Sequence, residues 1–272
     1  MMKKDKTFFY YVFDWDNNIL NLSTPMYFKK RINNCWKNVT IFPNDFAKIR
    51  KKYGAEYMNN PEWKATQKTA FTEFGDYGKR GNMAFIEDCI VAINNKDFGP
   101  SWDSFIQTIM EGRLFSIATT RGHEPATIKK VVRYIIENIL TPSQKQIMAD
   151  NLKEFAKFFK IKNKDLLTYY LNKCYFIGLF SKKFKKQFGY VPYGELIEKG
   201  KQDAIQYFIE YVRKFAQRHN KSLSVGFSDD DIHFSNAAKQ LFIKMKNLNE
   251  NENYYVFDTS NRKIKGGIRI KI

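Results

Sequence analysis

Carboxylates follow directly after two apolar segments of the chain. Asp14 and Asp16 follow residues 8–13, and the acidic run 229–231 follows residues 223–227. Like charges this close raise one another's pKa or require a cation. A cluster of carboxylate oxygens suits Mg²⁺, a hard ion that prefers oxygen ligands. Either acidic group alone would also fit a turn or a helix N-cap, whereas the combination predicts a magnesium site. Its predicted ligands are Asp14, Asp16, Asp229 and Asp230.

A third apolar run, residues 114–118, ends in hydroxyls and a cation. Thr119 and Thr120 come first, followed by Arg121 and His123. The hydroxyl pair makes the combination with the two acidic groups more specific than either acidic group alone. Arg121 fits two roles equally, because its guanidinium can bind a phosphate or pair with a carboxylate. His123 likewise fits contact with a substrate or a structural role in the turn.

The segments that carry these side chains have the pattern of strands buried on both faces. Apolar residues run continuously in residues 8–13, 114–118, 223–227 and 254–257, and more weakly in residues 175–180. Such continuity is typical of parallel strands. Helical periodicity separates the runs, which predicts an α/β fold: a Rossmann-like, mostly parallel sheet with helices on both faces. Because the carboxyl ends of parallel strands form the sites of such folds, we expect the three polar groups to meet there.

Two intervals are longer than a single crossover helix requires. Residues 21–105 contain helix-start signals such as Pro43-Asn44-Asp45, and residues 141–173 open with Thr141-Pro142-Ser143. We therefore predict a helical cap insertion at 21–105 and a smaller helical insertion at 141–173. The core would consist of residues 1–20 and 106–258. Residues 259–272 are basic and would form an edge hairpin or a mobile end.

The polar segments together resemble the haloacid dehalogenase (HAD) superfamily of Mg²⁺-dependent phosphohydrolases. Its four motifs occur in order, as FFYYVFDWD, LFSIATTRG, a lysine within Glu198-Lys199-Gly200-Lys201, and LSVGFSDDD. The resemblance covers roughly residues 7–20 and 112–245. Many members have Gly-x-Thr or x-Thr after the second Asp, where this chain has Asn17-Asn18. Members often carry a cap between the first two motifs, so the resemblance implies a HAD-like core covered by the insertion.

The resemblance also implies roles for single residues. Asp14 would attack the phosphorus and form an aspartyl-phosphate. Asp16 would protonate the leaving oxygen, then deprotonate the hydrolytic water, and would offer its backbone carbonyl to the metal. Thr119 would hydrogen-bond the phosphoryl group. Lys201, or else Lys199, would balance the charge on Asp14 and the phosphate.

The remaining implied roles concern the metal and the substrate. Asp229 and Asp230 would complete or orient the Mg²⁺ shell. Three Asp residues stand in a row, so this register is ambiguous by one, and we favour the first two. The predicted substrate-binding residues are Thr119, Thr120, Arg121 and Lys201.

These features give two hypotheses of different class. The first is a Mg²⁺-dependent phosphomonoester hydrolase. A nucleotide or a nucleic-acid end phosphate is an attractive substrate, because a basic surface would attract a polyanion, and a small sugar phosphate or a phosphoprotein stays open. Phosphoryl transfer to an acceptor other than water stays open. The alternative is a non-catalytic HAD-like protein that serves as a scaffold in a nucleic-acid or phage assembly, because fold alone does not dictate function.

Charge favours a polyanionic partner. The 272 residues include 46 Lys and Arg against 28 Asp and Glu, a net charge of +18. The densest basic stretch, residues 151–190, holds ten lysines and two acids. This balance fits nucleic acid bound through a basic surface, but a Lys-rich solvated surface explains it as well without any partner.

Composition also excludes several classes of protein. The chain is too apolar and aromatic for a disordered protein, and it has no apolar run near the ~20 residues that span a bilayer. Cys35, Cys89 and Cys174 are widely spaced, which argues against a disulfide framework and a zinc site. The N-terminus lacks the pattern of a signal peptide. We therefore expect a cytoplasmic protein with no membrane partner, and its oligomeric state stays open.

Overall fold

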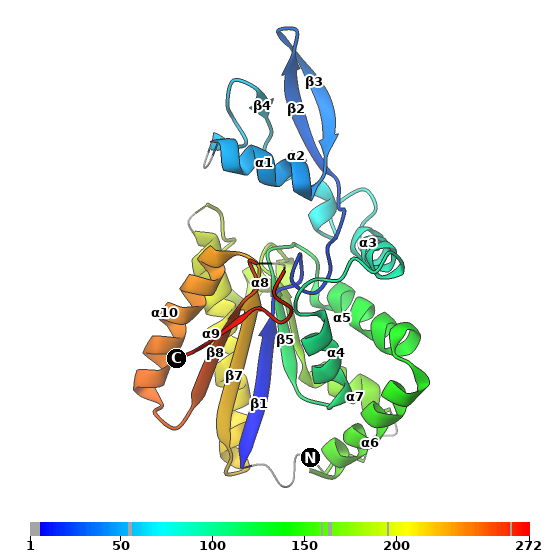
Figure 1. Cartoon of the computed structure of the whole chain (residues 1–272), viewed down its shortest axis with the longest axis vertical. Coiled ribbons are helices and arrows are strands. Elements are labelled where there is room, and N and C mark those ends of the chain that lie inside the picture. Colours follow the sequence, from blue (N-terminus) through cyan, green and yellow to red (C-terminus); the bar gives the residue numbers. More distant parts are fainter. Residues whose placement is uncertain (1–5, 54–55, 159, 163–164, 195, 262) are drawn as a thin grey trace.

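A six-stranded sheet lies at the centre of the molecule (Figure 1). The computed structural model describes residues 6–53, 56–158, 160–162, 165–194, 196–261 and 263–272. In spatial order the strands are β6 (Tyr175–Gly178), β5 (Phe115–Thr119), β1 (Thr7–Phe13), β7 (Ser222–Asp229), β8 (Asn253–Asp258) and β9 (Ile268–Lys271). Pairing is parallel from β6 to β8, and β9 runs antiparallel to β8. The predicted α/β class and mostly parallel sheet are confirmed, and the basic tail supplies the edge strand.

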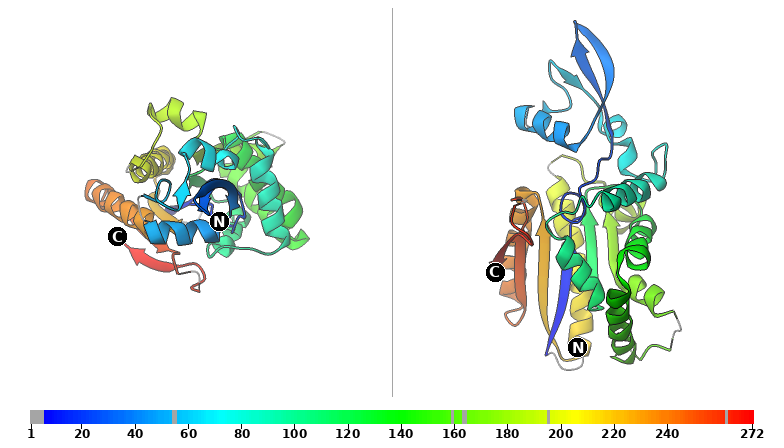
Figure 2. Two further views of the ribbon diagram at one scale, coloured as in Figure 1. Left: turned by 90° about the horizontal axis from the view of Figure 1, so that it is seen from above. Right: turned by 45° about the vertical axis from the view of Figure 1, so that its right-hand side comes forward.

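Helices cover both faces of this sheet, which explains why its strands are apolar on both sides. Val12 and Phe13 are neighbours in β1, so they point to opposite faces, and both have no exposed surface. On one face, α4 (Trp102–Met110) packs Phe105 against Phe13 and Phe115. On the other, α9 (Leu196–Arg218) crosses β1, β5 and β7, with α10 (Ile232–Leu248) beside it (Figures 1 and 2).

The other helices of this part of the chain agree with the periodicity of the sequence. Pro125 opens its helix as predicted, and a π-helix, Ile135–Ile139, continues it. Residues 141–173 are largely helical, as expected. The bounds are α3 (Met83–Asn94), α5 (Pro125–Tyr134), α6 (Pro142–Phe158), α7 (Leu166–Lys173) and α8 (Lys182–Phe188).

The insertion after β1 is not mostly helical, contrary to the prediction. It contains a three-stranded antiparallel sheet made of β2 (Met26–Ile32), β3 (Cys35–Ile41) and β4 (Trp63–Lys64). Asn33 and Asn34 both have positive φ, 49° and 61°, which is the backbone of a two-residue type I′ hairpin turn. Met26 and Phe28 are buried, whereas Tyr27 and the lysines beyond it are exposed. The alternation of apolar and polar residues that indicates a strand therefore lasts only a few residues before the charged residues begin.

Helices complete this part of the insertion, and we call residues 26–74 the cap lobe. They are α1 (Pro43–Tyr53), α2 (Gln67–Ala70) and the 3₁₀ turn η2 (Thr72–Phe74). The lobe has its own small hydrophobic cluster, formed by Met26, Phe28, Ile41, Ile49 and Ala70. The following helices, α3 and α4, instead bury their apolar faces in the main hydrophobic cluster of the core.

Hydrogen bonds from the end of the cap lobe and the residues just after it hold the lobe to the core. The amide of Gly122 donates to the carbonyl of Phe74 at 2.6 Å. The carboxylate of Asp76 contacts Nδ1 of His123 at 2.8 Å and accepts hydrogen bonds from the amide of Glu124 and the hydroxyl of Thr127. Asp76, just after the cap lobe, therefore joins this part of the chain to the first turn of α5.

His123 makes this attachment sensitive to pH. Its side chain is fully buried, and burial, reinforced by nearby Arg121, lowers its pKa to about 4 against the opposing pull of Asp76. As the pH falls below the pKa of an exposed histidine, about 6.5, the unfolded chain takes up a proton that the folded chain does not. The stability contributed by neutral His123 is therefore lost as the pH falls.

We expect this loss to appear in a comparison with the His123→Asn variant, which can still donate a hydrogen bond to Asp76. The free energy of unfolding of the wild type, relative to the variant, should be about 2 kcal/mol lower at pH 5 than at pH 8, taking 1.36 kcal/mol per pKa unit. Urea denaturation at both pH values measures it. A difference that does not change with pH would show that folded His123 is protonated as easily as an exposed histidine.

Candidate active site

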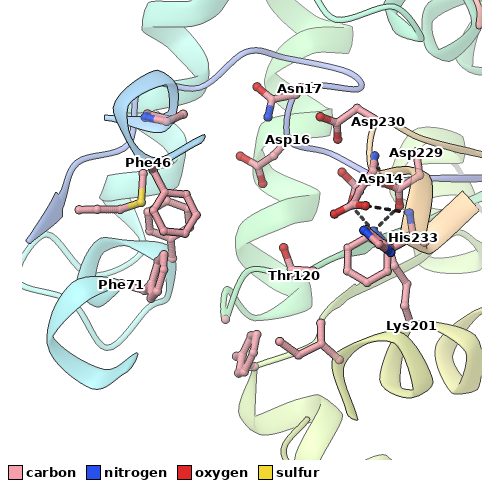
Figure 3. A pocket seen from close by; sticks show the side chains of 18 of the residues that line it. Asp14, Asp16, Asn17, Phe46, Phe71, Thr120, Lys201, Asp229, Asp230 and His233 are labelled. Carbon is pink, nitrogen blue, oxygen red and sulfur yellow. Dashed lines mark hydrogen bonds and ion pairs between the residues drawn. The ribbon is translucent and has the colours of Figure 1, made fainter. Parts of the chain in front are cut away.

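Strand register brings the predicted polar groups to one edge of the sheet. Phe13 of β1 pairs with Ser228 of β7 and with Ile117 of β5. Asp14 and Asp229, each one residue further along, therefore leave neighbouring strands side by side (Figure 3). The amide of Asp14 also donates to the carbonyl of Ser228 at 2.9 Å. The predicted meeting of these acidic segments is confirmed.

Asp14, Asp229 and Asp230 form a compact acidic group. Each offers one carboxylate oxygen, and these oxygens all lie within 4.8 Å of one another. Asp14 and Asp229 are buried, with 5% and 1% of their surface exposed, and Asp230 is half-buried. The predicted register of the last two ligands agrees with this group. The carboxylate of Asp16, the fourth predicted ligand, lies outside it.

Lys201 supplies the cation of this group. It is 2% exposed, and its Nζ donates to Oδ1 of Asp14 at 2.7 Å and to Oδ2 of Asp229 at 2.5 Å. The other lysine proposed for this position, Lys199, is solvent-exposed and pairs with Asp203. The helical spacing of α9 thus turns Lys201 inward and Lys199 outward.

Burial and charge perturb the pKa values of Asp14, Asp229 and Lys201. Burial raises the pKa of Asp14 and of Asp229 above the usual range of a carboxyl, although Lys201 opposes the rise. Burial alone would lower the pKa of Lys201, but the two carboxylates outweigh it and the pKa is raised. Three carboxylates against one ammonium leave an excess of negative charge among oxygen donors. This donor set fits a hard divalent cation such as Mg²⁺.

Asp16 is held by Arg121 rather than by the acidic group. Nε and Nη2 of Arg121 donate to both oxygens of Asp16, with distances of 2.8 and 2.7 Å to Oδ2 and Oδ1. Arg121 is 1% exposed and its guanidinium packs over the rings of Phe74 and Phe85. Of the two roles open to Arg121, the structure places it against a carboxylate, while Asp16 still faces the cavity (Figure 3).

The two threonines occupy different positions. Thr119 is the last residue of β5 and is fully buried, and its hydroxyl reaches Asp16 Oδ2 at 3.4 Å. Thr120 is one residue further and lines the cavity near the carboxylates (Figure 3). The hydroxyl available to a ligand is therefore that of Thr120.

A cavity of about 610 Å³ opens above this edge, between the core and the cap lobe. The acidic group, Asp16, Thr120 and Lys201 line its core side. The opposite side is largely apolar, and sequence reasoning did not assign these residues to a site. The cap-lobe residues that line it are Met26, Pro43, Phe46, Tyr57, Lys68, Phe71 and Phe74.

Asn18 is a second residue that sequence reasoning did not place. It is fully buried, and its amide nitrogen donates to the carbonyls of Asp14 and Ser228 and to Oγ of Ser228. Its Oδ1 accepts hydrogen bonds from the hydroxyls of Ser101 and Thr259. Asn18 therefore fixes the loop that carries Asp14 and Asp16. The only feature of the sequence that could have drawn attention to Asn18 is that many HAD members have threonine in this short segment after the second Asp.

Comparisons of the chain with protein-family models, curated protein sequences and solved structures find no match. The resemblance to the HAD superfamily therefore rests on the four motifs, on the α/β sheet and on the acidic group. Within the part of the chain that the structure describes, no helix combines the length and apolarity needed to cross a bilayer.

Mg²⁺ is expected to stabilise the protein through the acidic group. A ligand that binds only the folded state stabilises it by about 2.7 kcal/mol at about 100 times its Kd, so millimolar Mg²⁺ should raise the thermal midpoint, and EDTA should reverse this. Asp230→Asn should remove most of the shift. Differential scanning fluorimetry measures it.

Asp231→Asn is the matched control. Asp231 lies outside the acidic group, and its Oδ1 caps α10 by accepting from the amide of His233, a contact that Asn can keep. Equal Mg²⁺ shifts in the two variants would contradict the assignment of Asp230.

Proposed function

We propose that the protein is a metal-dependent phosphomonoester hydrolase that acts through an aspartyl-phosphate on Asp14. The observation that carries the proposal is the contact of Lys201 with both Asp14 and Asp229, beside Asp230, at the floor of a cavity. A nucleophilic carboxylate beside a cation and a potential metal site suits phosphoryl transfer, because this chemistry depends on neutralising phosphoryl oxygens.

The residues then divide the work as follows. Asp14, Asp229 and Asp230 would hold Mg²⁺, which supplies positive charge to the phosphoryl oxygens. Asp14 attacks phosphorus, and the bond from phosphorus to the leaving oxygen breaks. Lys201 balances the negative charge on Asp14 and on the phosphate.

Asp16 is the proposed acid and base. It gives a proton to the leaving oxygen and takes one from the water that hydrolyses the aspartyl-phosphate. Arg121 fixes the orientation of Asp16 through its bidentate contact with the carboxylate. The hydroxyl of Thr120, rather than that of Thr119, donates to the transferring phosphoryl group, because Thr120 lines the cavity.

The cavity favours a substrate whose leaving group is larger than a simple alkyl chain. A volume of about 610 Å³ lies within the usual range of small-molecule sites. Phe46 and Phe71 of the cap lobe face the site across the cavity (Figure 3), and rings stack favourably on planar groups. A nucleotide or the phosphorylated end of a nucleic acid combines a phosphate with such a planar group.

Asp14→Asn tests the nucleophile. With p-nitrophenyl phosphate and Mg²⁺, we expect the turnover of this variant to fall about a thousand-fold or more, because the amide cannot form the acyl phosphate. Loss of wild-type turnover with EDTA is expected as well. Circular dichroism checks that the variant is folded. Near-full turnover by a folded Asp14→Asn protein would overturn the assignment.

Thr120→Val and Thr119→Val form a second test. Valine keeps the shape and removes the hydroxyl. We expect Thr120→Val to lower kcat/KM about a hundred-fold, the typical effect of losing one donor to a transition-state oxygen. Thr119→Val should cost less, since its hydroxyl contacts Asp16 and lies outside the cavity. The reverse order would assign the phosphoryl contact to Thr119.

A further inference from the structure

The solvent side of the cap-lobe sheet carries a distinctive set of side chains. Directly paired residues of antiparallel strands share a face, and the register pairs Tyr27 with Thr40, Lys29 with Asn38 and Lys64, and Arg31 with Trp36. We call these seven residues the outer face. The opposite side of the sheet is buried at Met26, Phe28 and Ile41, with Phe28 packed against Phe46 of α1, whereas Lys30 and Lys37 further along it are exposed.

The outer face is cationic and aromatic. Lys29, Arg31 and Lys64 are exposed, and Tyr27 is 40% exposed. Nζ of Lys64 lies 4.6 Å from the ring centroid of Trp36. None of the seven side chains is acidic, and among the described residues no carboxylate pairs with Lys29, Arg31 or Lys64.

This clustering of cations is unfavourable in the protein alone. Lys29 and Lys64 stand directly opposite each other in the β2–β4 pair, a position where like charges destabilise a sheet. The strands β2 and β3 contain four basic residues, Lys29, Lys30, Arg31 and Lys37, and no acid. A bound polyanion would relieve the repulsion.

We propose that the outer face binds single-stranded nucleic acid. Cations on neighbouring strands can follow a phosphate backbone, and Tyr27 and Trp36 offer rings on which unpaired bases stack. A duplex keeps its bases stacked in its interior, so it would contact the cations of the outer face but not stack on Tyr27 and Trp36. A membrane surface would need apolar side chains among the cations, and the outer face has none apart from its two rings. This site is separate from the cavity and does not depend on the proposed hydrolase activity.

Fluorescence anisotropy with labelled oligo-dT and oligo-rU of about 10 nucleotides tests the proposal. A variant with Lys29→Gln, Arg31→Gln and Lys64→Gln should bind at least ten-fold more weakly at low salt. Its plot of log K against log salt concentration should also be shallower by about 2, since each lost phosphate contact removes about 0.7. Trp36→Leu should weaken binding about ten-fold with the slope unchanged, because it removes stacking alone.

The matched control changes the same number of charges on the densest basic stretch. Lys183→Gln, Lys185→Gln and Lys186→Gln alter exposed side chains of α8, and binding should stay within two-fold of the wild type. Three results would each overturn the proposal. The first is equal weakening by both triple variants, and the second is absence of binding at low salt. The third is equal affinity for a duplex together with no effect of Trp36→Leu. Turnover of p-nitrophenyl phosphate by the outer-face variant reports separately on the cavity.

Discussion

Lys201 is the cation on which the arrangement of the acidic edge depends. Its ammonium is buried between Asp14 and Asp229, at 2.7 and 2.5 Å. Removing one partner of a buried ion pair costs about 3–5 kcal/mol, because a charge is left buried and unpaired. Lys201 is carried to this position by α9, which buries Phe208, Ile209 and Val212 against the sheet. The apolar contacts of one helix therefore determine the electrostatics of the site.

The backbone around Asp14 is fixed just as firmly. Asn18 holds the loop to β7 and to two hydroxyls from distant segments. Gly99 lies against the same loop, where an added Cβ would stand 2.4 Å from the carbonyl oxygen of Asn18. A side chain at position 99 would push the loop away. The geometry of the carboxylates is thus set by backbone contacts as well as by Lys201.

The sequence predicted the features that depend on local residue pattern, namely the strands and the residues at their ends. It did not predict the features that depend on how the cap lobe packs on the core. Continuous apolar runs identified the five parallel strands, and the strand ends identified Asp14 and Asp229. The β2–β3 hairpin was not predicted, because the alternation of apolar and polar residues in β2 lasts only a few residues before the lysines begin. Thr119 and Thr120 differ by one position, and only the end of β5 decides which hydroxyl reaches the cavity. Phe46, Tyr57, Phe71 and Phe74 form the aromatic wall of the cavity. The place of this wall depends on where the cap lobe sits, and sequence pattern does not encode that position.

A series of polar contacts links that position to the candidate site. Arg121 contacts Asp16 and also donates to the hydroxyl of Thr24, on the chain leaving for the cap lobe. Thr24 donates to Asp88 at 2.6 Å, and Asp88 pairs with Arg80, on the chain that returns from the lobe. The same guanidinium therefore orients the proposed acid–base residue and anchors one of the two connections of the cap lobe. A shift of the lobe at these connections would move the contacts of Asp16, so the aromatic wall and Asp16 are positioned together.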